Sequence, residues 1–214
     1  AYSNLAQLFM LAQESVAAED WANKAITVAR ELDDQNTLAH ALNNLGSTRL
    51  RDGDPAGFAL LEESLDIAVR VKFDDHAGRA YANLIWVNLD YRQYEKAERY
   101  IEEGLAYARS KELAGSTYYI TAERARVGFE CGRWSQAERD ARWVLSKPEE
   151  PGITRMPALA AHARVQVRRG DPDAEATIEQ GLQLVEPTGE LQWIAPVAIA
   201  RSELAWLRGD VGGL

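Results

Sequence analysis

Histidine and cysteine are the residues of this chain whose side chains most readily do chemistry. His40, His76 and His162 are its three histidines, and Cys131 is its one cysteine. Imidazole and thiolate bind zinc, and a thiolate beside a histidine is a nucleophile, but both uses need partners at suitable spacing. None of the histidines has a second histidine or cysteine at metal-ligand spacing. We expect structural or surface roles for the histidines, a partly buried Cys131 beside a turn, and no metal site.

Paired carboxylates are the next candidates for chemistry. Glu62-Glu63 and Glu102-Glu103 could serve as acid–base partners. Adjacent residues of a helix point about 100° apart, so at least one member of each pair must face water. A solvated helix surface is the better interpretation of both pairs. The sequence also lacks the G-x-x-x-x-G-K-[ST] phosphate loop and the G-x-S-x-G nucleophile motif. We therefore predict no enzymatic activity and no cofactor.

Composition limits the partners and the compartment. The chain has 214 residues and a formal charge of −9, which repels phosphate backbones and argues against direct nucleic-acid binding. No apolar run is long enough to cross a bilayer, so we expect no membrane insertion. One cysteine excludes an intramolecular disulfide and suits a reducing cytoplasm, so we predict a cytoplasmic protein.

The elements that must position any site repeat along the chain. GDPAGFALLEESLDIA, from Gly53, aligns without a gap with GDPDAEATIEQGLQLV, from Gly170. Small residues recur in one column of the aligned copies. Large apolar residues recur in a second column about eight positions later, which is two helical turns plus one residue. The small column holds Ala18, Gly57, Ala97, Ala137 and Ala174, and the large column holds Ile26, Leu65, Leu105, Leu145 and Leu182. This pattern predicts a second helix (B) of each repeat that packs closely against its neighbours.

A preceding segment repeats as well and predicts the first helix (A) of each unit. Its small or apolar positions form two columns: Ala41, Ala80, Ile120, Ala158 and Val197, then Gly46, Ile85, Ala125, Ala163 and Ser202. Pro157 and Pro196 are expected in the first turn of their A helices. Gly53, Gly132, Gly170 and Gly209 are expected to end A helices, while the equivalent turn at Tyr91-Arg92-Gln93-Tyr94 has no glycine.

The predicted architecture is an all-α solenoid of antiparallel helix pairs with a period of about 39 residues. We expect one repeat domain over residues 1–214, with about five A/B pairs and an unpaired final helix over residues 194–208. Outer loops are expected near residues 33–36, 73–75, 112–115, 148–152 and 187–190. Neither end has a polar capping repeat, so we expect a fragment of a longer protein, or self-association through the uncapped ends.

The stretch Ala39-His40-Ala41-Leu42-Asn43-Asn44-Leu45-Gly46, followed by the Gly53-Asp54 turn, resembles helix A of a tetratricopeptide repeat (TPR). The resemblance covers essentially the whole chain. It departs from the family in its longer period and in Leu42 and Arg49, where tryptophan and tyrosine are expected. The phrase LEESLDIA is similar to TPR arrays of large bacterial ATP-binding transcriptional regulators of the LuxR or MalT type. The resemblance implies a right-handed superhelix that acts as a regulatory or scaffolding module.

In TPR stacks, A-helix side chains at fixed positions line the concave surface, and the resemblance carries this role to seven residues here. They are Asn43, Arg79, Trp86, Tyr119, Arg126, Arg164 and Arg168. Arg126, Arg164 and Arg168 could form a basic strip that binds an acidic peptide or a carboxylate. In the alternative, these arginines pair with Glu123, Glu130 and Glu203 and are neutralised.

The leading functional hypothesis is a non-catalytic, protein- or peptide-binding module of a cytoplasmic bacterial transcriptional regulator. The alternative is a sensor domain for a small ligand or a signalling peptide, in which binding changes the curvature of the stack.

Overall fold

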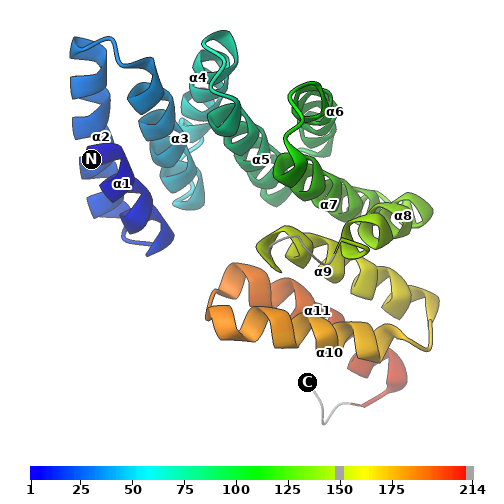
Figure 1. Cartoon of the computed structure of the whole chain (residues 1–214). Coiled ribbons are helices and arrows are strands. Elements are labelled where there is room, and N and C mark those ends of the chain that lie inside the picture. Colours follow the sequence, from blue (N-terminus) through cyan, green and yellow to red (C-terminus); the bar gives the residue numbers. More distant parts are fainter. Residues whose placement is uncertain (148–151, 211–214) are drawn as a thin grey trace. The chain divides into compact units, whose positions relative to one another are not determined.

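The computed structural model describes residues 1–147 and 152–210. Over these residues the chain forms eleven α-helices and one short 3-10 helix and no β-strand (Figure 1). The all-α prediction is therefore confirmed for the described part of the chain. The residues divide into two compact units, Ala1–Ser116 and Thr117–Leu214, which we describe separately. The predicted single domain, period and superhelix handedness stay predictions.

The first unit consists of three helix pairs and the start of a further helix. The pairs are α1 (Tyr2–Leu11) with α2 (Ser15–Glu31), α3 (Gln35–Arg51) with α4 (Gly57–Arg70), and α5 (Asp74–Asp90) with α6 (Tyr94–Ser110). Each A helix packs against its own B helix, and α1, α3 and α5 also contact one another in succession. Side chains on neighbouring A helices can therefore meet.

The second unit follows the same order. It contains α7 (Ala114–Glu130) from Thr117 onward, then α8 (Trp134–Leu145), α9 (Gly152–Arg169), α10 (Ala174–Val185), the 3-10 helix η1 (Glu186–Thr188) and α11 (Leu191–Arg208). Its core brings α9, α10 and α11 together around Val167, Ile178 and Val197. Of the predicted loop over residues 148–152, residues 148–151 lie outside the described residues.

The small B-helix column is buried in the structure. All five of its residues, Ala18, Gly57, Ala97, Ala137 and Ala174, are buried. The two A-helix columns are also buried, except for Ser202. Ser202 lies on α11, where the described chain supplies no following B helix to cover it. The columns that the sequence predicted are therefore packing positions, as expected from their small side chains.

The predicted place of the two prolines is wrong. Pro157 and Pro196 lie inside α9 and α11, each about one and a half turns after the helix start. A proline there removes a backbone hydrogen bond to the preceding turn, which costs stability. The first turns still form because Met156 of α9 and Trp193 of α11 pack against the core of this unit. Tertiary packing thus outweighs the local preference for starting each helix at proline.

Two series of backbone positions with positive φ produce the turns. Between A and B helices they are Gln13, Gly53, Arg92, Gly132 and Gly170, and between B and A helices they are Asp33, Lys72, Glu112 and Gly189. Gly209 adopts the same conformation at the end of α11. The four predicted turn glycines are confirmed. Arg92 adopts the same left-handed conformation (φ 55°) without being glycine. The turn therefore forms at a steric cost.

Arg92→Gly is expected to raise the free energy of unfolding by about 0.5–1 kcal/mol, because glycine removes the Cβ strain of a left-handed residue. Urea unfolding followed by circular dichroism measures the change. Gly132→Ala is the inverse control, since Gly132 has φ 76° and a Cβ added there would meet only open space, so strain alone should destabilise it. Equal stability of Arg92→Gly and the parent chain would contradict this account.

Candidate binding surface on the A helices

Polar side chains gather on one side of the A helices of the first unit. We call this surface the A-helix face and define it by Gln7 of α1, by His40, Asn43 and Ser47 of α3, and by Arg79, Asn83 and Trp86 of α5. On α3 and α5 these residues are three or four positions apart, so each set lies on one side of its helix. Asn43, Arg79 and Trp86 are residues that the resemblance to tetratricopeptide repeats assigned to a groove.

The first polar link across the A-helix face connects α3 and α5 through His40, with Gln7 of α1 beside it. The Arg79 Nη1 atom donates to Nε2 of His40 at 2.9 Å, and Oε1 of Gln7 lies 3.2 Å from the same nitrogen. Because a guanidinium can only donate, Nε2 of His40 must be the acceptor and its proton must sit on Nδ1. The imidazole is therefore neutral in this arrangement.

A second link lies one helical turn further along α3 and α5. The Asn83 Nδ2 atom donates to Oδ1 of Asn43 and to Oγ of Ser47, both at 3.2 Å. Asn43 is only 3% exposed, and its own Nδ2 atom is buried without a hydrogen-bond partner. A buried amide donor that lacks an acceptor costs free energy, so this group is available to donate a hydrogen bond.

Burial sets the protonation of the histidines on this surface. Burial, together with the positive charge of Arg79 and the neighbouring His76, lowers the pKa of His40 from 6.5 to about 4. His76 stacks on His40 with ring centroids 5.3 Å apart, and burial also lowers its pKa. Their spacing along the chain gave no sign that these two histidines would stack. They meet because α3 and α5 are adjacent A helices.

The second unit presents a different arrangement of charge. Arg164 pairs with Glu130 (2.7 Å) and Arg168 pairs with Glu203 (2.6 Å). Both guanidinium groups also lie over the ring of Phe129, at 4.1 and 4.7 Å from its centroid.

Arg126 lies 3.6 Å from the fully buried carboxylate of Glu123. Arg126–Glu123, Arg164–Glu130 and Arg168–Glu203 are the three pairs that the sequence offered as the alternative to a basic strip. The positive charges of these three arginines are therefore compensated within the second unit.

The other residues considered from sequence occupy ordinary positions. The carboxylate pairs Glu62-Glu63 and Glu102-Glu103 are exposed on B helices, as predicted, and Cys131 is partly buried. Trp86 and Tyr119 are half-buried on α5 and α7. Sequence reasoning missed Gln7, His76 and Asn83. Asn83 aligns with Asn44, one residue after Asn43, and these asparagines of successive A helices were the available signal.

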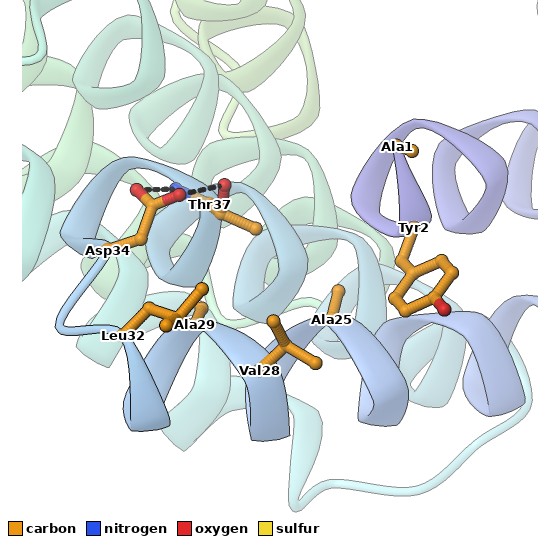
Figure 2. Close-up of a pocket in the computed structure, with 8 residues that line it drawn as sticks. All are labelled: Ala1, Tyr2, Ala25, Val28, Ala29, Leu32, Asp34 and Thr37. Atoms are coloured by element: carbon orange, nitrogen blue, oxygen red, sulfur yellow. Dashed lines mark hydrogen bonds between the residues drawn. The ribbon is translucent and has the colours of Figure 1, made fainter.

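A small pocket also opens beside the start of α1 (Figure 2). Its volume is about 280 Å³, and its lining from α2 is mainly apolar: Ala25, Val28, Ala29 and Leu32. Both carboxylate oxygens of Asp34 accept hydrogen bonds from Thr37, which cap α3. Sites for small molecules orient their ligands with polar groups that converge on the pocket. The carboxylate of this lining, Asp34, is already hydrogen-bonded to Thr37.

The described residues offer neither a metal cluster nor a membrane span. Among residues 1–147 and 152–210, no three histidine, cysteine or acidic side chains lie close enough to hold a metal ion. No helix in the same part of the chain is both long and apolar enough to span a bilayer.

The fold is similar to known tetratricopeptide-like repeat structures. A Podosopora anserina protein assigned as a kinesin light chain, with nearly identical TPR-like repeats, matches with a TM-score of 0.63 and 16% identity, over 87% of this chain and 94% of that one. A variant of it matches with a TM-score of 0.64 and 17% identity, over 88% and 94%.

A signal transduction ATPase with numerous domains (STAND) that carries a tetratricopeptide repeat sensor, from Pyrococcus horikoshii, matches with a TM-score of 0.65 and 14% identity. This match covers 98% of our chain and 33% of the STAND protein. No protein-family model and no curated protein matches the chain. At these identities the comparisons establish the fold, which is a TPR-like helical solenoid.

Proposed function

We propose that the chain is a non-catalytic scaffold that binds a peptide segment of a protein partner on its A-helix face. The observation that carries this proposal is the row of polar side chains across α1, α3 and α5, in which the Asn43 amide has an unused donor. Extended helical-repeat surfaces bind peptides in this way, through many weak contacts along successive repeats.

The proposal places the chain in a cytoplasmic bacterial transcriptional regulator, as its interaction or sensor module. The similarity in fold to the repeat sensor of a STAND protein supports a regulatory role. The candidate residues of the second unit, Tyr119, Arg126, Arg164 and Arg168, belong to a separate surface. Its arginines would have to exchange their glutamate partners for acidic groups of a ligand. Arg79 of the first unit has no glutamate partner to exchange, because its hydrogen bond goes to His40. We therefore assign the main binding site to the first unit.

Selection from a random peptide library tests the proposal. Binders of the 214-residue chain are expected to lose at least about tenfold in affinity on Trp86→Ala, because half-buried aromatic side chains are frequent anchors of protein interfaces. Glu102→Ala on the exposed side of α6 is the control and should leave affinity unchanged. Circular dichroism would verify that both variants remain helical. Binders that tolerate both substitutions, or an absence of binders, would contradict the proposal.

The alternative is a sensor for a small ligand, and the pocket beside α1 is the observation that favours it. The pocket is apolar and near the lower size limit for small-molecule sites. Val28→Trp would fill it from α2 and should abolish binding of any small ligand there while leaving peptide binding on the A-helix face intact.

A further inference from the structure

The exposed side of α8 differs in charge from that of the other B helices. The fifth and sixth positions after the small B-helix column face solvent in α2, α4, α6, α8 and α10. In chain order they hold Asn23-Lys24, Glu62-Glu63, Glu102-Glu103, Arg142-Trp143 and Glu179-Gln180. The fourth repeat therefore carries a cation and an indole where two other repeats carry solvated carboxylate pairs. Packing within the chain does not require this change, because both positions are exposed in every copy.

Trp143 is exposed, yet its ring is held in one orientation. The side chain is 41% exposed, and its ring centroid lies 5.0 Å from that of Tyr118 on α7, with 38° between the ring planes. The Lys147 Nζ atom lies 5.9 Å from the centroid of the same indole. A ring that its neighbours already orient loses little conformational entropy when a partner binds. Tryptophan is also among the most frequent anchors of protein interfaces.

Uncompensated positive charge surrounds this indole. Arg139 is exposed one helical turn before Trp143, and Lys147 follows just past the end of α8. Within residues 1–147 and 152–210 neither of these cations forms an ion pair. Arg142 pairs with Oε1 of Glu138 at 2.6 Å, but Arg169 donates to the other oxygen of the same carboxylate. One negative charge thus serves two guanidinium groups, and the surroundings of the indole are basic.

We propose that this surface binds an acidic segment of a protein partner. We call it the α8 face and define it by Tyr118, Arg139, Arg142, Trp143 and Lys147. An apolar side chain of the segment packs on the indole, and carboxylates on either side of it pair with the surrounding cations. The α8 face lies on a B helix of the second unit. It is therefore separate from the A-helix face, and the inference does not depend on the function proposed for that face.

A short acidic peptide suits the α8 face better than a nucleic acid does. The helix rises only about 12 Å between the positions of Arg139 and Lys147, at 1.5 Å per residue. A peptide of a few residues spans this distance and interacts with the basic surface alone. A longer phosphate backbone would extend past it and be repelled by a chain whose formal charge is −9.

A model peptide tests the proposal. It has a central phenylalanine flanked on each side by three glutamates and is blocked at both ends. The same peptide with glutamines in place of the glutamates is the neutral control, and a short oligothymidylate tests for nucleic acid. Each is titrated into the 214-residue chain labelled with nitrogen-15. We expect the acidic peptide to shift the indole N–H signal of Trp143 saturably, with a dissociation constant of roughly 0.1–1 mM. Salt at about 1 M should weaken this binding severalfold, because it screens exposed charges.

Two pairs of variants locate the site, with fluorescence anisotropy of a dye-labelled acidic peptide as the measurement. Trp143→Ala should weaken binding about tenfold or more, while Trp206→Ala, which removes another exposed tryptophan, should have no effect. Arg139→Gln should weaken binding about threefold. Its control is Arg109→Gln, which makes the same charge change at an exposed position of α6 and should leave the affinity unchanged. Circular dichroism verifies that all four variants remain helical.

Three results would overturn the inference. They are a Trp143 signal that does not shift saturably, equal losses in a variant and its control, and an oligothymidylate that binds as tightly as the acidic peptide. The last result would assign the α8 face to nucleic acid. Peptides that depend on Trp86 of the A-helix face should bind Trp143→Ala as tightly as the parent chain, so the two surfaces are tested separately.

Discussion

Gly57→Ala is expected to lower the free energy of unfolding by about 2 kcal/mol, a typical cost of overpacking a tight helix contact. A Cβ at Gly57 would lie 2.4 Å from the carbonyl oxygen of Gly46 and 2.7 Å from Cγ of Leu50. The first neighbour is backbone and cannot rotate away, so α3 and α4 must separate. Gly57 is the first residue of α4, so the helix preference of alanine offsets little of this cost.

Gly115→Ala is the matched control for this substitution. Gly115 also lies near the start of its helix, and a Cβ there meets no heavy atom within 4 Å. The same chemical change should therefore be neutral or slightly stabilising. Urea unfolding of both variants measures the difference. Similar stabilities for the two variants would show that α3 and α4 are not in close contact at Gly46 and Gly57.

Lowering the pH from 7 to 4 is expected to destabilise the chain by about 2–3 kcal/mol through His40. Burial lowers the folded pKa of His40 to about 4, from 6.5 for the free side chain. Below pH 6.5 the unfolded chain therefore binds a proton that the folded chain excludes. The stabilisation is fully present above pH 6.5 and is lost as the pH falls toward 4.

His40→Gln isolates this contribution. His76 and His162 also have pKa values lowered by burial, so they destabilise the fold in the same direction and remain in the variant. The pKa of Glu138 is lowered by its hydrogen bond from Arg169, and this carboxylate loses its contribution only at more acidic pH. The variant should show a clearly flatter dependence of stability on pH between 6.5 and 4. Parallel curves for the variant and the parent chain would refute a neutral, buried His40.

The packing of the helices was predictable from sequence because it depends on side-chain size. A small residue at Ala18, Gly57 or Ala137 is needed wherever two helices approach closely, whatever its neighbours are. Glycines in the turns were predictable for a similar reason, since Gly53 and Gly132 must adopt positive φ. Arg92 shows the limit of this reasoning, because the turn forms there without the favoured residue.

The polar site was less predictable because its properties come from pairs of residues on different helices. Among the described residues Arg79 has no carboxylate in contact while Arg164 pairs with Glu130, although both are arginines on A helices. The difference depends on which side chains the neighbouring repeat supplies, His40 in one case and Glu130 in the other. The resemblance to tetratricopeptide repeats assigned Asn43, Arg79 and Trp86 to one surface, but it did not reveal the stacked His40 and His76 or the unpaired Asn43 amide donor.

Paramagnetic broadening by a spin-labelled peptide tests the location of the binding surface most directly. A peptide selected from the library carries a nitroxide at one end and is added to the full 214-residue chain. If the partner lies along the A-helix face, the side-chain amide signals of Asn43 and Asn83 broaden, while that of the exposed Asn23 on the B helix α2 stays sharp. Broadening of Asn23 with unchanged Asn43 and Asn83 signals would place the peptide on the B helices and contradict the assignment.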